Sequence, residues 1–167
     1  AMSALLIYYH SINKKNIHDL FLFSTDLESI GKWYRQLMGE SIGKEYDRQG
    51  KKVYTGITPT VSIGSVDLHS MAQLYLGGPF DKFTTFVKIE NKHHQLSLPD
   101  KSEYDSLVAG IQCQSISDIM NAIFLGTKKA FEKGKRPFVE ISLPDKKENS
   151  LGQFLQMKMM EMMFLGA

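Results

Sequence analysis

The sequence has a single cysteine and no long apolar segment, and both features limit the class of protein. Cys113 is the one cysteine among 167 residues. An internal disulfide is therefore excluded, and the composition favours a reducing, cytoplasmic environment. No apolar run reaches the roughly 18 residues that a membrane-spanning helix needs. We therefore expect a cytoplasmic protein with no membrane partner.

Net charge is also small. The chain has 20 basic and 18 acidic residues, which gives a formal net charge of +2. Because the basic residues are scattered along the chain, neither nucleic acid nor a membrane surface is expected as a partner. Hydrophobic residues make up 43% and charged residues 23%, as in a globular domain. The length fits one such domain with a hydrophobic core.

Motifs for nucleotides and metals are missing as well. No G-x-G-x-x-G occurs. The stretch GESIGKEY, from Gly39 to Tyr46, contains a GK pair, but a Walker loop has four residues between its glycine and that pair and here there are three. The pair His93-His94 has no cysteine or carboxylate at ligand spacing. We therefore expect no nucleotide cofactor and no metal.

The sequence does contain an alternation of short apolar runs and amphipathic segments. Strands are predicted at 17–24, 53–55, 82–90 and 137–143. Helices are predicted at 2–12, 27–43, 66–76, 117–133 and from 150 to the end. This order predicts an α/β fold, a three-layer sandwich in which helices flank a small parallel sheet. With no repeat and no internal boundary, residues 1–167 form a single domain.

The junction after the first long strand holds an acidic residue. Glu28 lies in the first turn of the predicted helix, beyond the carboxyl end of the strand, and ligands bind at that edge of open α/β sheets. An acidic residue there also complements the helix dipole. Position alone therefore leaves a catalytic and a structural interpretation open.

Three stretches resemble glucose-6-phosphate isomerases. One is the series TP, SIG, DLHS, QLYLGGP and DKFTTF between Gly56 and Phe86, and another is TDLESIGKWYRQL from Thr25 to Leu37. The C-terminal LGQFLQMKMMEMMFLGA extends the likeness over most of the chain. The resemblance implies a flavodoxin-like sugar-isomerase (SIS) domain, cut from a longer two-domain enzyme. Both ends lie within apolar, helix-like patterns, which agrees with that interpretation.

The resemblance implies the interconversion of glucose 6-phosphate and fructose 6-phosphate through an enediolate, in glycolysis and gluconeogenesis. This reaction needs a base that carries a proton between adjacent carbons and an acid/base that opens the sugar ring. By resemblance, Glu28 is the base. By the same resemblance, His69 opens the sugar ring, and it does so in the active site of the neighbouring subunit of a homodimer. Asp67 and Gln73 are implied to support His69. No metal or cofactor is implied.

Some features of the family are absent from this chain. It has no GGR segment, whose arginine stabilises the enediolate, and no Ser/Thr-rich phosphate loop. The family's catalytic lysine lies beyond Ala167, and Lys158 does not match it. We therefore expect negligible activity from the isolated chain. Two alternatives stay open: a non-catalytic phosphosugar-binding SIS domain, which LESIGK and DLHS disfavour, and a structural dimerisation module.

Overall fold

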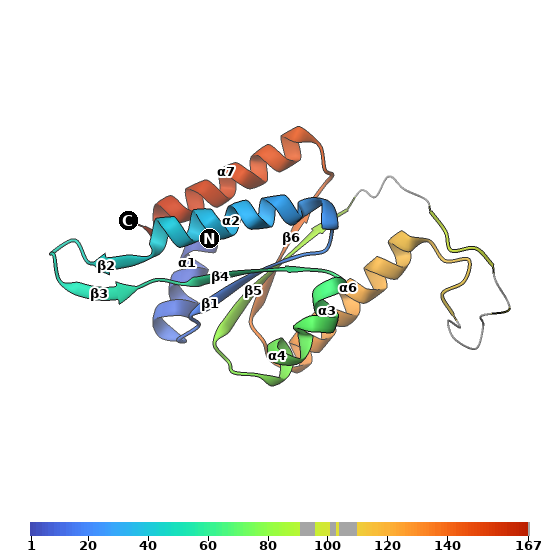
Figure 1. The fold of residues 1–167 in the computed structure, drawn as a ribbon, viewed down its shortest axis with the longest axis horizontal. Coiled ribbons are helices and arrows are strands. Elements are labelled where there is room, and N and C mark those ends of the chain that lie inside the picture. Colours follow the sequence, from blue (N-terminus) through green and yellow to red (C-terminus); the bar gives the residue numbers. More distant parts are fainter. Residues whose placement is uncertain (91–95, 101–102, 104–109, 167) are drawn as a thin grey trace.

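Four parallel strands form the central sheet, in the spatial order β4, β1, β5, β6 (Figure 1). The computed structural model describes residues 1–90, 96–100, 103 and 110–166. The strands are β1 Ile17–Leu22, β4 Thr58–Ile63, β5 Lys82–Ile89 and β6 Phe138–Leu143. Leu22, at the end of β1, is level with Ile63 of β4 and Val87 of β5. The carboxyl ends of these three strands therefore share one edge of the sheet.

Helices cover both faces of this sheet and complete the three-layer sandwich predicted from the sequence. One face carries α1 (Met2–Ile7), α2 (Glu28–Ile42) and α7 (Glu148–Leu165). The other carries α3 (Val66–Ser70), α4 (Ala72–Gly77) and α6 (Ile116–Lys133) (Figure 1). No helix in the described part of the chain is long and apolar enough to cross a membrane.

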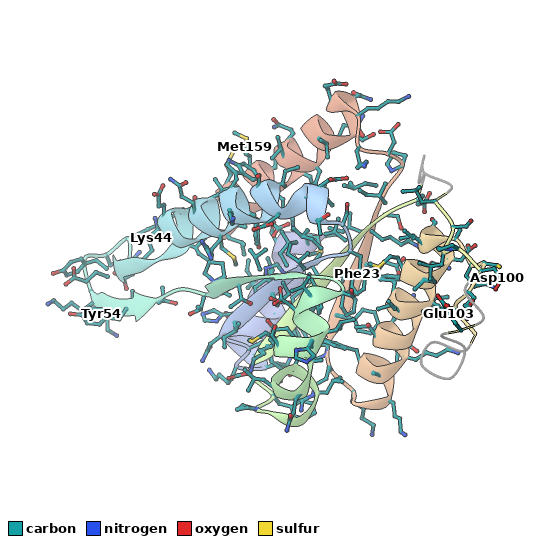
Figure 2. All side chains as sticks on the ribbon, turned by 45° about the vertical axis from the view of Figure 1, so that its right-hand side comes forward. Phe23, Lys44, Tyr54, Asp100, Glu103 and Met159 are labelled. Carbon is teal, nitrogen blue, oxygen red and sulfur yellow. The ribbon has the colours of Figure 1, made fainter. Side chains whose placement is uncertain are left out.

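Side chains of β1 alternate between the two helical layers, because successive residues of a strand point to opposite faces. Leu20 and Leu22 belong to the hydrophobic cluster under α1, α2 and α7. Phe21 and Phe23 belong to the aromatic cluster under α4 and α6. Phe23, labelled in Figure 2, packs edge-on against Phe124 of α6, with ring centroids 4.8 Å apart. β1 is thus buried on both faces, as its largely apolar run predicted.

A two-stranded hairpin extends from the end of α2. It consists of β2 (Lys44–Tyr46) and β3 (Lys52–Thr55), which pair antiparallel. Lys44 and Tyr54 mark it in Figure 2, at the end of the molecule away from α6. The sequence predicted only the second of these strands. Gly43 is the C-cap of α2, with an extended backbone.

Several expected elements differ in detail. β4, the edge strand beside β1, was not predicted from the sequence. The helix expected at 66–76 is divided at Met71 into α3 and α4. Thr25 and Asp26 do not cap α2 through their side chains; they form a 3-10 turn that leads into it. The helix expected at 2–12 is confirmed, its second half being a π-helical turn. His93-His94 lie outside the described residues.

The outer side of α7 is apolar and exposed. Met163 is 74% exposed and Phe164 66% exposed, and Met159, labelled in Figure 2, lies on the outer side of the same helix. Met162 instead packs into the core. The methionine-rich sequence therefore supplies both core packing and an apolar surface.

Candidate functional site

Two of the predicted site residues follow neighbouring strands at the same edge of the sheet. β1 leads to the helix that begins with Glu28, and β4 leads to the helix that carries His69. The N–H of Gly64, just after β4, donates to the carbonyl oxygen of Leu22 at the end of β1, at 2.9 Å. Both segments therefore begin side by side at the carboxyl edge, where ligands bind to such sheets. They then continue on opposite faces, because α2 and α3 cover different sides.

Glu28 is the first residue of α2, and its side chain is 50% exposed. Its Oε1 lies 2.7 Å from Nζ of Lys32, one helical turn later. An exposed pair of this kind contributes only about 0.3–0.5 kcal/mol. A base that removes a proton from carbon works best when its carboxylate is shielded from water. The described residues of one chain do not shield Glu28 in this way.

A second glutamate on α2 lies in the same local sequence. The residues Glu-Ser-Ile-Gly-Lys occur twice, from Glu28 to Lys32 and from Glu40 to Lys44. Glu40 is exposed near the end of α2 and accepts a hydrogen bond from Nε2 of Gln36 at 3.2 Å. Glu40 was not among the residues predicted for the site. The motif by itself does not distinguish the two carboxylates.

His69 is exposed on α3, and Gln73 is exposed on α4. Among the described residues, neither side chain has a hydrogen-bond partner. The structure therefore gives no support to a direct contact between Gln73 and His69 within one chain. An exposed imidazole at the carboxyl edge is free to enter a site that another surface completes.

Asp67 closes the turn between β4 and α3. Its Oδ2 accepts the N–H of Ile63 at 2.7 Å, and its Oδ1 accepts the hydroxyl of Ser70 at 2.8 Å. The partners of Asp67, Ile63 and Ser70, lie before and after His69 in the sequence, and neither bond involves the His69 ring. The geometry thus gives Asp67 a role in holding the start of the segment, and its support of His69 stays a prediction.

A buried carboxylate lies beneath this segment and was not singled out in the sequence. Asp19 is fully buried in β1, and its Oδ1 accepts hydroxyl hydrogen bonds from Thr60 (2.7 Å), Ser62 (3.0 Å) and Tyr75 (3.1 Å). Burial raises the pKa of Asp19, and the three hydroxyl donors oppose that shift. Burial and the Asp19 charge raise the pKa of Tyr75 to about 12. One acidic residue within an apolar strand was the signal for this network.

Arg136 binds the other end of the same segment. Its Nη1 donates to the carbonyl oxygen of Pro79 at 3.1 Å, and its Nη2 donates to Gly78 at 2.9 Å and Leu76 at 2.5 Å. The guanidinium also lies 3.7 Å from the ring centroid of Phe80. These contacts join the α6–β6 connection to the residues that follow α4.

A second polar network is buried on the opposite face. His18 Nε2 lies 2.8 Å from the Thr85 hydroxyl, and its Nδ1 lies 2.6 Å from the Tyr34 hydroxyl. Burial, and then the charge of Lys158, keep the pKa of His18 well below its usual value. His18 is therefore a neutral core histidine, hydrogen-bonded at both ring nitrogens. No group of three or more metal-ligating side chains is found among the residues that the structure describes.

Comparison with known proteins finds similar sequences over most of this chain. A glucose-6-phosphate isomerase of Carboxydothermus hydrogenoformans is 30% identical over 152 residues, which are 91% of this chain and 33% of that protein. One from Methanocaldococcus jannaschii is 32% identical over 166 residues, which are 99% of this chain and 38% of that protein. The chain is homologous to glucose-6-phosphate isomerases. It spans roughly a third of the length of these relatives. No protein-family model matches it.

Two solved structures share the fold of this chain. A hypothetical protein from Thermus thermophilus superposes with a TM-score of 0.87 at 27% identity, over 98% of this chain and 38% of that protein. A glucose-6-phosphate isomerase from Chlamydia trachomatis superposes with a TM-score of 0.81 at 19% identity, over 99% of this chain and 33% of that protein. At that identity the second match shows the fold alone.

Proposed function

We propose that residues 1–167 are the second SIS domain of a two-domain glucose-6-phosphate isomerase. The enzyme would interconvert glucose 6-phosphate and fructose 6-phosphate in the cytoplasm, in glycolysis and gluconeogenesis. The homology to isomerases over nearly the whole chain supports this proposal. The observation that carries it is the arrangement at the carboxyl edge, where the segments of Glu28 and His69 begin beside each other.

The proposed chemistry uses one base and one ring-opening acid/base. The carboxylate takes the proton from C2 of the open-chain aldose and returns it to C1 of the enediolate, so it ends the reaction ionised as it began. In the same conversion the proton of the C2 hydroxyl passes to the oxygen on C1, which leaves the carbonyl group at C2. The imidazole of His69 protonates the ring oxygen when the sugar opens and recovers the proton when the product closes, because histidine titrates near neutral pH. No cofactor takes part in these steps.

This chain holds only part of the proposed site. The exposed Glu28 needs a surface that excludes water, and the exposed His69 needs a substrate to which it donates. We propose a homodimer in which His69 enters the site of the partner subunit. The apolar outer side of α7, next to a groove of about 730 Å³ lined by Met2, Met160 and Phe164, would contact the rest of the longer protein. Isolated residues 1–167 would then have negligible activity.

The test replaces each candidate glutamate in the full-length protein. Glu28→Gln and Glu40→Gln keep the shape of the side chain and remove the base, and Glu132→Gln on α6 is the matched control. Loss of the catalytic base should lower kcat for fructose 6-phosphate by at least about 100-fold. A fall in kcat for Glu28→Gln alone supports the proposal as stated. A fall in kcat for Glu40→Gln alone assigns the base to the second copy of the motif, and an unchanged kcat in both variants contradicts the proposal.

A non-catalytic phosphosugar-binding domain is the second candidate function. The exposure of both Glu28 and His69 within one chain is the observation that favours it. Such a domain would bind fructose 6-phosphate without turnover even in the full-length protein. Calorimetric binding together with an inactive wild-type protein would therefore select this alternative.

A further inference from the structure

We propose that Arg136 and the Asp19–Tyr75 pair are positioning residues for His69. They fasten the α3–α4 segment to the rest of the domain, so that the exposed imidazole is presented in one orientation. This inference rests on the proposed ring-opening role of His69.

The segment needs anchors because it is intrinsically weak. α3 has five residues and α4 has six, with Met71 between them outside helical geometry. Isolated helices of this length are unstable in water. The His69 ring has no hydrogen-bond partner among the described residues, so no hydrogen bond from them fixes the ring. Its orientation therefore depends on how the backbone of the segment is fixed.

Arg136 holds the far end of the segment. Only 9% of the residue is exposed, and all three of its hydrogen bonds go to carbonyl oxygens just within or after α4. The last carbonyls of a helix have no partners inside the helix, so a buried cation there supplies the missing donors. The planar guanidinium reaches several carbonyls and stacks on Phe80 at once. A lysine ammonium cannot reproduce this geometry.

The Asp19–Tyr75 pair holds the middle of the segment. Tyr75 on α4 donates its hydroxyl to Asp19 Oδ1 and lies 2.8 Å from the hydroxyl of Ser62. Its ring is buried in the aromatic cluster between the sheet and α6. These two bonds therefore join α4, the helix that follows His69, to β1 and β4, whose carboxyl ends share one edge of the sheet. Together with Asp67 at the start, the segment is anchored at three places.

The experiment uses conservative variants of the full-length protein. Tyr75→Phe removes one hydroxyl. Arg136→Lys keeps the positive charge but removes the planar guanidinium that donates to three carbonyl oxygens. Tyr34→Phe is the matched control, because Tyr34 is also a buried tyrosine with a hydrogen-bonded hydroxyl, but on the opposite face of the sheet. Hydrogen–deuterium exchange of residues 66–77 reports the anchoring, and NMR of the His69 ring reports its environment. Steady-state kinetics with fructose 6-phosphate report the consequence for turnover.

We expect Tyr75→Phe and Arg136→Lys to speed exchange in residues 66–77 by about tenfold, the equivalent of losing one buried hydrogen bond. The His69 resonances should shift or broaden, and kcat should fall about tenfold with KM changed less than about threefold. Tyr34→Phe should leave exchange in this segment and kcat within about twofold. Rapid exchange with unchanged kcat, unchanged exchange, or equal effects from Tyr34→Phe would each overturn the inference. An inactive wild-type protein would refute the proposed function, while exchange and NMR would still test the anchoring.

Discussion

Lys158 and Glu161 form an ion pair that is almost completely shielded from water. Lys158 is 0% exposed and Glu161 is 3% exposed, on the inner side of α7. Nζ lies 3.0 Å from Oε2 and 3.3 Å from Oε1 of the carboxylate. The ammonium also lies 4.9 Å from the ring centroid of Tyr34 on α2. Each charge is therefore tolerated in the core because the other is present.

Lys158→Met should destabilise the protein by about 3–5 kcal/mol, because it leaves the Glu161 carboxylate buried without its cation. That loss is a large part of the roughly 5–15 kcal/mol that stabilises a typical domain. The double variant Lys158→Met with Glu161→Leu replaces both charges by apolar groups of similar size, and should be neutral or more stable. Urea unfolding of both variants measures the difference. A single variant that costs less than about 1 kcal/mol, or a double variant as unstable as the single one, would refute this reasoning.

The same pair gives a signature in the pH dependence of stability. Burial is the main cause that lowers the pKa of Lys158 from 10.5, and the Glu161 charge opposes it. The folded protein therefore binds this proton less tightly than the unfolded chain. Burying the charged ammonium lowers the stability of the fold by its full amount at pH values below the pKa of Lys158 in the folded protein. This loss becomes smaller as the pH rises toward 10.5, the pKa in the unfolded chain. Through that pH range the free energy of unfolding of the wild type should increase relative to that of Lys158→Met. A difference between the two proteins that stays constant with pH would contradict burial as the cause of the lowered pKa.

Three further predictions use other parts of the domain. Gly31→Ala puts a methyl group 2.5 Å from a side-chain carbon of β4 and should lower the free energy of unfolding by about 1–3 kcal/mol. Gly39→Ala on the same helix meets nothing within 4 Å and should raise that free energy by up to about 1 kcal/mol. Urea unfolding compares the two variants. Burial raises the pKa of Asp19, so its contribution to stability falls as pH rises above 3.8; Asp19→Asn should lack this fall in thermal unfolding from roughly pH 3 to roughly pH 7. Mixing full-length His69→Asn and Glu28→Gln subunits should restore about a quarter of the wild-type activity if each site uses both subunits, and no recovery would place both residues in one chain.

Local sequence patterns were sufficient for most of the fold. The largely apolar run of β1 and the three- and four-residue spacing of apolar residues in α2 predicted the type and position of both elements. β4 was missed because it carries Pro59 and alternates polar residues, which fits an edge strand but resembles a loop. The break at Met71 was missed because no glycine or proline marks it in the sequence.

The buried networks could not be predicted from local patterns. Asp19 finds its partners Thr60, Ser62 and Tyr75 between 41 and 56 residues away. Such contacts follow from strand order and register, which a single sequence does not display. The edge that holds the candidate site was predictable, because it follows from a parallel sheet. The five-residue motif did not settle the choice between Glu28 and Glu40, because both glutamates begin the same residues, Glu-Ser-Ile-Gly-Lys.

The central claim is that this domain supplies the ring-opening group of a sugar-phosphate isomerase. It is tested most directly by following glucose 6-phosphate formation from fructose 6-phosphate with full-length wild-type protein and His69→Asn. The account predicts turnover by the wild type and a loss of at least about 100-fold in kcat/KM in the variant, with its folding intact. A wild type without turnover, or a His69→Asn protein as active as the wild type, would contradict the claim.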